Sequence, residues 1–182
     1  INMVITMFYN YYLNIYWVFK IIYYVLIGMG VWFVADLMKK KILFVCSANT
    51  CRSAVMAAIL TEYGHKRYDV SSAGIFARTG EPMMQECADA LEALFGHGFS
   101  AYSHTATKLN SSHLMDNDIV VAVSQGYAEL LKTHFPYYAD KVITFPGEGF
   151  SDISLLRGRS MEIAVERIRD AIFEMFLKDE EN

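Results

Sequence analysis

The sequence has few cysteines, only three in 182 residues. A small odd number does not suggest a disulfide framework and fits a reducing, intracellular compartment. A strong charge of either sign is also missing, because 16 basic and 20 acidic side chains give a net charge of -4. Nothing in this balance favours nucleic acid as a partner. No internal repeat is present, so the length suits one domain, or one domain plus an extension.

The first part of the chain is almost free of charge. Residues 1–19 carry no charged side chain, Lys20 interrupts, and 21–35 is uncharged again. This stretch is long enough to cross a bilayer, which takes about 20 apolar residues. The lysines at 39–41 would then keep the rest of the chain on the cytoplasmic side. Two interpretations of this hydrophobic, helix-like segment at 1–37 stay open: a membrane anchor, or an upstream extension that is not part of the working protein.

The remainder, residues 38–182, alternates short apolar runs with helical patterns and is interpreted as one domain. We predict strands over 41–45, 68–72, 118–123 and 142–145, and helices over 53–64, 82–95, 110–115, 124–135 and 160–177. Pro82 is expected in the first turn of its helix. Strands that alternate with helices predict an α/β fold with a parallel sheet covered on both faces. Ligands bind such sheets at the carboxyl ends of the strands.

A loop at the carboxyl end of the first strand carries the chemistry. It reads Cys46-Ser47-Ala48-Asn49-Thr50-Cys51-Arg52-Ser53. Its amides, the positive end of the following helix and the Arg52 guanidinium all favour an anion at the centre. Cys46 is therefore expected as a thiolate that attacks phosphorus, with water then hydrolysing the phosphocysteine. Ser53 can donate to the sulfur and Asn49 can hold the curl of the loop. No metal or cofactor is needed.

The other two cysteines flank this chemistry in different ways. Cys51 is interpreted either as a second thiol that forms a reversible disulfide with Cys46 on oxidation or as plain packing. Cys87 lies on the apolar face of the helix predicted over 82–95 and is assigned to the core.

The run 45–53 resembles the signature of the low-molecular-weight protein tyrosine phosphatases. That family also includes bacterial protein-arginine phosphatases and thioredoxin-coupled arsenate reductases. Ser72-Ala73-Gly74 and His104 match as well, and the likeness covers Met38 to about Lys178. It implies a three-layer sandwich with a four-stranded parallel sheet, the phosphotyrosine protein phosphatase I-like fold. It also implies a nucleophilic cysteine, a phosphate-binding arginine and a phosphorylated protein as substrate. The residues implied to hold that substrate are Ser47, Ala48, Asn49, Thr50, Cys51 and Ser53.

Thr50 brings the chain nearer to the arginine-phosphatase branch, because tyrosine-directed members usually carry a bulkier aliphatic residue there. Ala48 departs from the usual Gly and is expected to strain a position that needs a positive φ. Ala54 stands where Pro is usual, a mild change at the helix start.

The general acid is the serious departure. The family's Asp-Pro pair maps to Leu155 and Leu156, and leucine cannot protonate a leaving group. Asp152, three residues earlier, is the candidate substitute, and Glu148 is a weaker one.

Three functions follow. The first is a cysteine-dependent protein phosphatase that hydrolyses phosphoarginine or phosphotyrosine on the cytosolic side. The second is a catalytically weakened relative that only binds phospho-ligands, which the missing Asp-Pro pair motivates. The third is an arsenate reductase, whose cysteine relay follows the third strand in the family. The residues there, 124–127, contain no cysteine, so the sequence speaks against it.

Overall fold

A computed structural model describes residues 18, 20, 23–25, 39–96, 103–146 and 153–178. The chain divides into two compact units, Ile1–Lys39 and Lys40–Asn182. In the first, residues 18, 20 and 23–25 are helical, and the rings of Tyr23 and Tyr24 pack edge to face with centroids 5.8 Å apart. Among the described residues, no helix has both the length and the apolar character that crossing a bilayer requires. Most of the segment 1–37 lies outside the described residues, so its interpretation stays a prediction.

The second unit is built on four parallel strands. These are β1 (Lys40–Cys46), β2 (Tyr68–Gly74), β3 (Ile119–Ala122) and β4 (Val142–Thr144), in the order β2-β1-β3-β4. The chain runs outward from β1 to β2 and then returns to the other side of β1 for β3 and β4. The switch point of the sheet therefore lies between β1 and β3, where open α/β sheets bind their ligands. The predicted α/β fold with a four-stranded parallel sheet is confirmed.

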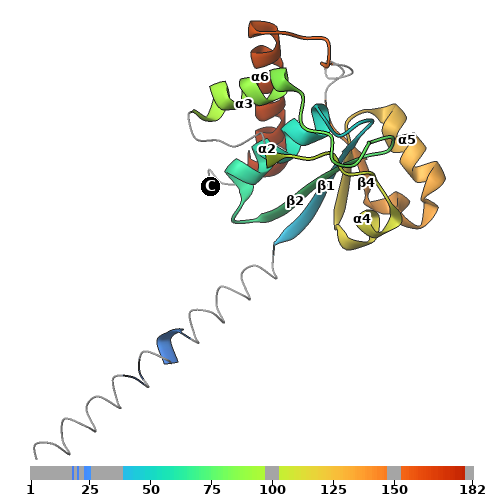
Figure 1. Ribbon diagram of the computed structural model, residues 1–182. Coiled ribbons are helices and arrows are strands. Elements are labelled where there is room, and N and C mark those ends of the chain that lie inside the picture. Colours follow the sequence, from blue (N-terminus) through green and yellow to red (C-terminus); the bar gives the residue numbers. More distant parts are fainter. Residues whose placement is uncertain are drawn as a thin grey trace, which may run out of the picture. The chain divides into compact units, whose positions relative to one another are not determined.

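Both faces of the sheet are buried, and β1 shows how. Side chains alternate across a strand, so Ile42 and Phe44 enter one core while Leu43 and Val45 enter the other. The first core lies under α2 (Arg52–Gly64), α3 (Gln85–Phe95) and α6 (Arg159–Ile172), which continues as the π-helical turn η4 (Phe173–Leu177). The second lies under α4 (Ser111–Asp116), α5 (Gln125–His134) and the 3-10 turn η2 (Pro136–Lys141). Figure 1 shows these two helical layers on either side of the strands.

The short helix α4 is held at both ends by side chains. Asn110 accepts from the backbone N–H of His113, whose ring in turn accepts from the Asn110 N–H, a reciprocal capping box. At the other end, Lys141 Nζ donates to three carbonyl oxygens: those of Leu114 (3.3 Å), Met115 (3.1 Å) and Asn117 (2.8 Å). Because these oxygens have no partner within the helix, one lysine satisfies most of its carboxyl end.

The start of α3 differs from the prediction. The helix begins at Gln85, and Pro82 instead forms an isolated antiparallel bridge with Thr105. The N–H of Met84 donates to the carbonyl of Thr50 at 2.9 Å, which ties this extended stretch to the loop after β1. Tertiary hydrogen bonds therefore replace the first turn that the sequence pattern predicts.

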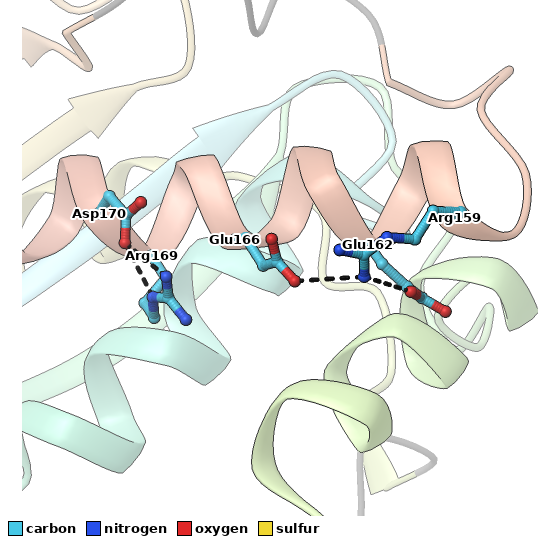
Figure 2. A network of polar contacts seen from close by, with 5 residues as sticks. All are labelled: Arg159, Glu162, Glu166, Arg169 and Asp170. Carbon is cyan, nitrogen blue, oxygen red and sulfur yellow. Dashed lines mark hydrogen bonds and ion pairs between the residues drawn. The ribbon is translucent and has the colours of Figure 1, made fainter.

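Ion pairs run along the solvent side of α6 (Figure 2). Arg159 Nη1 lies 2.8 Å from Glu162 and 3.4 Å from Glu166, and Arg169 pairs with Asp170 at 2.7 Å. The hydrogen bond that Arg159 donates to Glu162 and the charge of Glu166 raise the pKa of Arg159. Exposed pairs of this kind contribute little to folding stability, so the buried face of α6 carries the energy that docks the helix.

Candidate active site

The loop after β1 curls around the sulfur of Cys46. This residue ends β1 with 3 % of its surface exposed. The backbone N–H of Asn49 donates to its Sγ at 3.2 Å, and the Oγ of Ser53 lies 2.9 Å from the same sulfur. Two polar hydrogens can thus face one sulfur. The structure brings these three residues together.

Asn49 holds the shape of the loop. Its side chain is fully buried, and its Nδ2 donates to Ser53 Oγ and Ser72 Oγ, both at 2.9 Å. Its Oδ1 accepts from the N–H of Thr107 at 2.8 Å, and its carbonyl oxygen, which can only accept, lies 2.7 Å from Nε2 of His104. Every polar atom of the Asn49 side chain is therefore satisfied, and the segments after β2 and before α4 fix the loop from outside.

The positive backbone φ of the loop lies at Asn49, so the expectation of strain at Ala48 is wrong. Asn49 has a φ of 60°, and among the described residues it is the one non-glycine with a positive φ. Ala48 needs no left-handed backbone and carries no such strain. Asn tolerates the left-handed region better than most residues because its short polar side chain can bond locally. The strained position of the loop is one residue further along than the family pattern suggests.

Gly74 at the end of β2 lets the loop approach. A Cβ at this position would lie 2.5 Å from the Ser47 carbonyl oxygen, 2.8 Å from the Asn49 nitrogen and 2.9 Å from the Ala48 carbonyl carbon. The following residues bond the same stretch: the N–H of Phe76 donates to the Ser47 oxygen at 2.9 Å. The loop therefore rests on the bare backbone of β2, which explains why glycine stands there.

A pocket of about 330 Å³ opens above the sulfur. The described residues that line it are Cys46, Ser47, Ala48, Asn49, Thr50, Cys51, Arg52, Met84, Tyr127 and Ser154. Within this set, the only charged side chain is that of Arg52, the first residue of α2. Its Cζ lies 5.6 Å from the ring centroid of Tyr127, within the range of a cation–π contact. The pocket is therefore suited to a small anion held over a thiol.

Three lining residues were missed from sequence. Met84, Tyr127 and Ser154 come from the stretches before α3, inside α5 and before α6. Of these, Tyr127 had a usable signal, because it follows the carboxyl end of β3, the edge of the sheet at which ligands bind. Met84 and Ser154 lie on connections that only the tertiary structure brings to the loop.

The two other cysteines meet behind the loop. Cys51 precedes α2, Cys87 lies on α3, and their sulfurs are 2.8 Å apart. Their exposed fractions are 6 % and 0 %, and none of the three cysteines forms a disulfide. Cys87 belongs to the core as predicted, and it also contacts a residue of the candidate site.

The segment before α6 is where the family places its general acid. None of the described residues of this segment presents a carboxylate to the pocket. Leu155 is 81 % exposed, Leu156 packs against the core, and Ser154 is the member that lines the pocket. Arg157 fixes this stretch, since its Nε lies 2.8 Å from Glu86 on α3 and its Nη1 donates to the Ser154 carbonyl at 2.9 Å. The candidates Asp152 and Glu148 lie outside the described residues.

Comparison with known proteins agrees with this geometry. Residues 41–147 match the family described as low molecular weight phosphotyrosine protein phosphatase. The chain is 34% identical over 107 residues to a protein-arginine-phosphatase of Geobacillus stearothermophilus, which covers 59% of this chain and 70% of the relative. It is 32% identical over 106 residues to the protein of that name from Bacillus subtilis, covering 57% and 68%. A solved low molecular weight protein tyrosine phosphatase from T. tengcongensis aligns with a TM-score of 0.69 at 28% identity, covering 77% of this chain and 99% of that one.

The chain belongs to the low-molecular-weight phosphotyrosine protein phosphatase family, and within it resembles the bacterial arginine-phosphatase branch. Members of this family are cysteine-dependent phosphatases. The predicted family, its fold and the enzyme class, a protein phosphatase, are thereby confirmed.

Proposed function

We propose that this protein removes phosphoryl groups from phosphoarginine side chains of proteins, with Cys46 as nucleophile. The observation that carries the proposal is the position of the Cys46 sulfur, at the floor of a pocket whose one charged lining group among the described residues is Arg52. Attack of Sγ on phosphorus breaks the bond to the leaving group and forms a phosphocysteine. Arg52 and the loop amides hold the equatorial oxygens as their charge develops.

Ser53 has a role in the second step. When water attacks the phosphocysteine, the sulfur leaves as a thiolate and gains negative charge. The Ser53 hydroxyl, 2.9 Å from that sulfur, donates a hydrogen bond that strengthens as this charge appears. The Asn49 N–H at 3.2 Å acts in the same way. Both donors are fixed before the reaction begins, so no reorganisation is needed at the transition state.

The choice of phosphoarginine rests on Thr50 and on the relatives. Thr50 lines the pocket, and its small, hydroxyl-bearing side chain can orient the hydrolytic water while leaving room for a guanidinium group. The two relatives named protein-arginine-phosphatase are 34% and 32% identical to this chain, and one named for tyrosine is 29% identical. Asp152 is proposed as the general acid that protonates the leaving nitrogen. The lysines at 39–41 support a catalytic domain on the cytosolic side.

Hydrolysis of matched phosphoarginine and phosphotyrosine peptides by the full chain tests this function. Cys46→Ser should abolish turnover of both, and Asp152→Asn should slow it at least 10-fold. Asp69→Asn is the matched control, because this exposed carboxylate lies at the amino end of β2, away from the loop. Activity that survives Cys46→Ser would rule out the mechanism. Asp152→Asn that behaves as Asp69→Asn would remove Asp152 as the acid.

The substrate preference needs its own pair of variants. Thr50→Val keeps the size of the side chain and removes the hydroxyl, whereas Thr50→Ser keeps the hydroxyl. We expect hydrolysis of the phosphocysteine to slow in Thr50→Val and to persist in Thr50→Ser, measured as a burst followed by a slower steady rate. Faster turnover of phosphotyrosine than of phosphoarginine by the wild type would contradict the proposed preference.

A binding protein with weakened catalysis is the second candidate, because exposed Leu155 stands where the family places its acid. Peptide binding without turnover by the wild type, measured by calorimetry beside the hydrolysis assay, would favour it over the phosphatase.

A further inference from the structure

A contact between two cysteine sulfur atoms joins the candidate site to the core. The sulfurs of Cys51 and Cys87 lie 2.8 Å apart, and a disulfide bond is about 2.05 Å long. Closing this gap requires a shift of less than about 1 Å. The loop carries Cys51 and α3 carries Cys87, so a bond between them would join two elements 36 positions apart in the sequence.

The surrounding backbone keeps the two thiols together. The Met84 N–H donates to the Thr50 carbonyl, one residue before Cys51, at 2.9 Å. The Met84 carbonyl in turn accepts from the Cys87 N–H at 3.0 Å. Met84 thus bridges the residue next to one cysteine and the backbone of the other. The approach of the sulfurs is therefore built into the way the loop docks on α3.

The three thiols differ in whether a molecule in the pocket can reach them. Cys46 and Cys51 both line the pocket, whereas Cys87 has no exposed surface. An oxidant that enters the pocket meets Cys46 at its floor, and it cannot reach Cys87 from solvent. Oxidation of Cys87 must therefore pass through Cys51.

We propose that Cys51 and Cys87 form a disulfide after Cys46 is oxidised, and that this disulfide returns Cys46 to its reduced state. The reaction begins when hydrogen peroxide oxidises the Cys46 thiolate to a sulfenic acid and releases water. The Cys51 thiol then displaces the sulfenic hydroxyl as a second water, forming a Cys46–Cys51 disulfide. Cys87 attacks the Cys51 sulfur, breaks that bond and expels the Cys46 thiolate. In sum, one peroxide and two thiols give one disulfide and two waters.

The final disulfide and the intermediate disulfide differ in whether Cys46 can still react. In the Cys46–Cys51 form the nucleophile is blocked. In the Cys51–Cys87 form Cys46 is a free thiol again, and the bond lies under the loop rather than across the pocket. A dithiol reductant of the compartment can later return the pair to thiols. The inference rests on the proposed function only in taking Cys46 as the reactive thiol.

Disulfide mapping of the peroxide-treated full chain tests the inference without any phosphatase assay. After treatment with hydrogen peroxide and quenching with an alkylating agent, mass spectrometry should find Cys51–Cys87 as the accumulated bond and Cys46 alkylated. In Cys87→Ser, which preserves the volume of the core, Cys46–Cys51 should accumulate instead. Thermal melting checks that this variant is folded, and Cys87→Ala serves as a second variant.

Activity on an aryl phosphate gives the second readout. Wild type should retain at least 5-fold more activity than Cys87→Ser after the same peroxide exposure. In Cys46→Ser the buried pair should stay reduced, since its entry point is gone. The inference is overturned if wild type stops at Cys46–Cys51, or if Cys46→Ser forms Cys51–Cys87 as fast as wild type does. Should the peptide assays reject phosphatase activity while the mapping finds Cys51–Cys87, the proposed function fails and this inference stands.

Discussion

Replacing Gly74 by alanine adds one methyl group under the loop and changes nothing else in the chain. The backbone of Gly74 has no positive φ, so alanine fits its conformation, and the effect is purely steric. The new Cβ would lie 2.5 Å from the carbonyl oxygen of Ser47, and ordinary contact begins at 3.4 Å. The loop must therefore retreat by about 0.9 Å, the difference between these two distances. Backbone atoms meet the methyl group, so no side chain can rotate away to relieve the contact.

Such a displacement is large for an active site. A shift of about 1 Å can cost about 100-fold in rate, because the nucleophile no longer aligns with its target. We expect kcat/KM of Gly74→Ala to fall by about 100-fold. The extra methyl group in a filled space should also lower the free energy of unfolding by about 1–3 kcal/mol.

The measurement is steady-state hydrolysis of an aryl phosphate together with unfolding in urea. Gly126→Ala is the matched control: it adds the same methyl group in the first turn of α5, where nothing lies within 4 Å. Its activity should be unchanged and its stability equal or up to about 1 kcal/mol higher, as alanine favours a helix over glycine. If Gly74→Ala keeps kcat/KM within about 2-fold of wild type, the steric reasoning is wrong.

Three further substitutions probe other parts of the fold. Tyr127→Leu removes the ring beside the Arg52 guanidinium and should lower kcat/KM about 5-fold, equivalent to about 1 kcal/mol. Tyr127→Phe keeps the ring and should not lower it. Equal losses in both variants would refute a role for the ring face. Asn49→Ala removes three side-chain hydrogen bonds from a buried site and should lower the free energy of unfolding by about 2–4 kcal/mol, measured in urea; a loss below about 1 kcal/mol would contradict the network. Lys141→Met removes the donor to three carbonyls at the carboxyl end of α4, and the free energy of unfolding should fall by about 1–3 kcal/mol with kcat/KM unchanged. A loss of activity would show coupling that the structure does not predict.

The local geometry of the loop was predictable because its residues are neighbours in the chain. A strand end, five residues and an arginine leave few ways to arrange a thiol and a guanidinium, and the Asn49 N–H to Cys46 Sγ contact is equally local. The sheet was predictable for a related reason. Apolar runs such as 119–122 are buried on both faces and interrupt the helical patterns clearly.

The rest depends on contacts between distant segments. Pro82 and Met84 read as the opening of a helix, yet the bridge between Pro82 and Thr105 and the hydrogen bond from Met84 to Thr50 keep this stretch extended. Nothing near Cys87 in the sequence indicates that its sulfur meets that of Cys51. The positive φ of the loop lies at Asn49 and not at Ala48, one residue beyond the position that the family pattern indicates. The local sequence pattern cannot predict the φ of Asn49, because hydrogen bonds between this residue and three other segments hold it.

Those bonds of Asn49 also bear on the order of events during synthesis. Its partners follow it by 23, 55 and 58 residues: Ser72, His104 and Thr107. At about 5–20 residues per second, a ribosome reaches Thr107 about 3 to 12 s after Cys46. During this interval the thiol is an ordinary sulfur on an unfinished chain, without the groups that shape its loop. A phosphate ion that binds only the completed loop should in turn stabilise the whole domain against unfolding. Anion binding at this loop is therefore expected to be linked to completion of the fold.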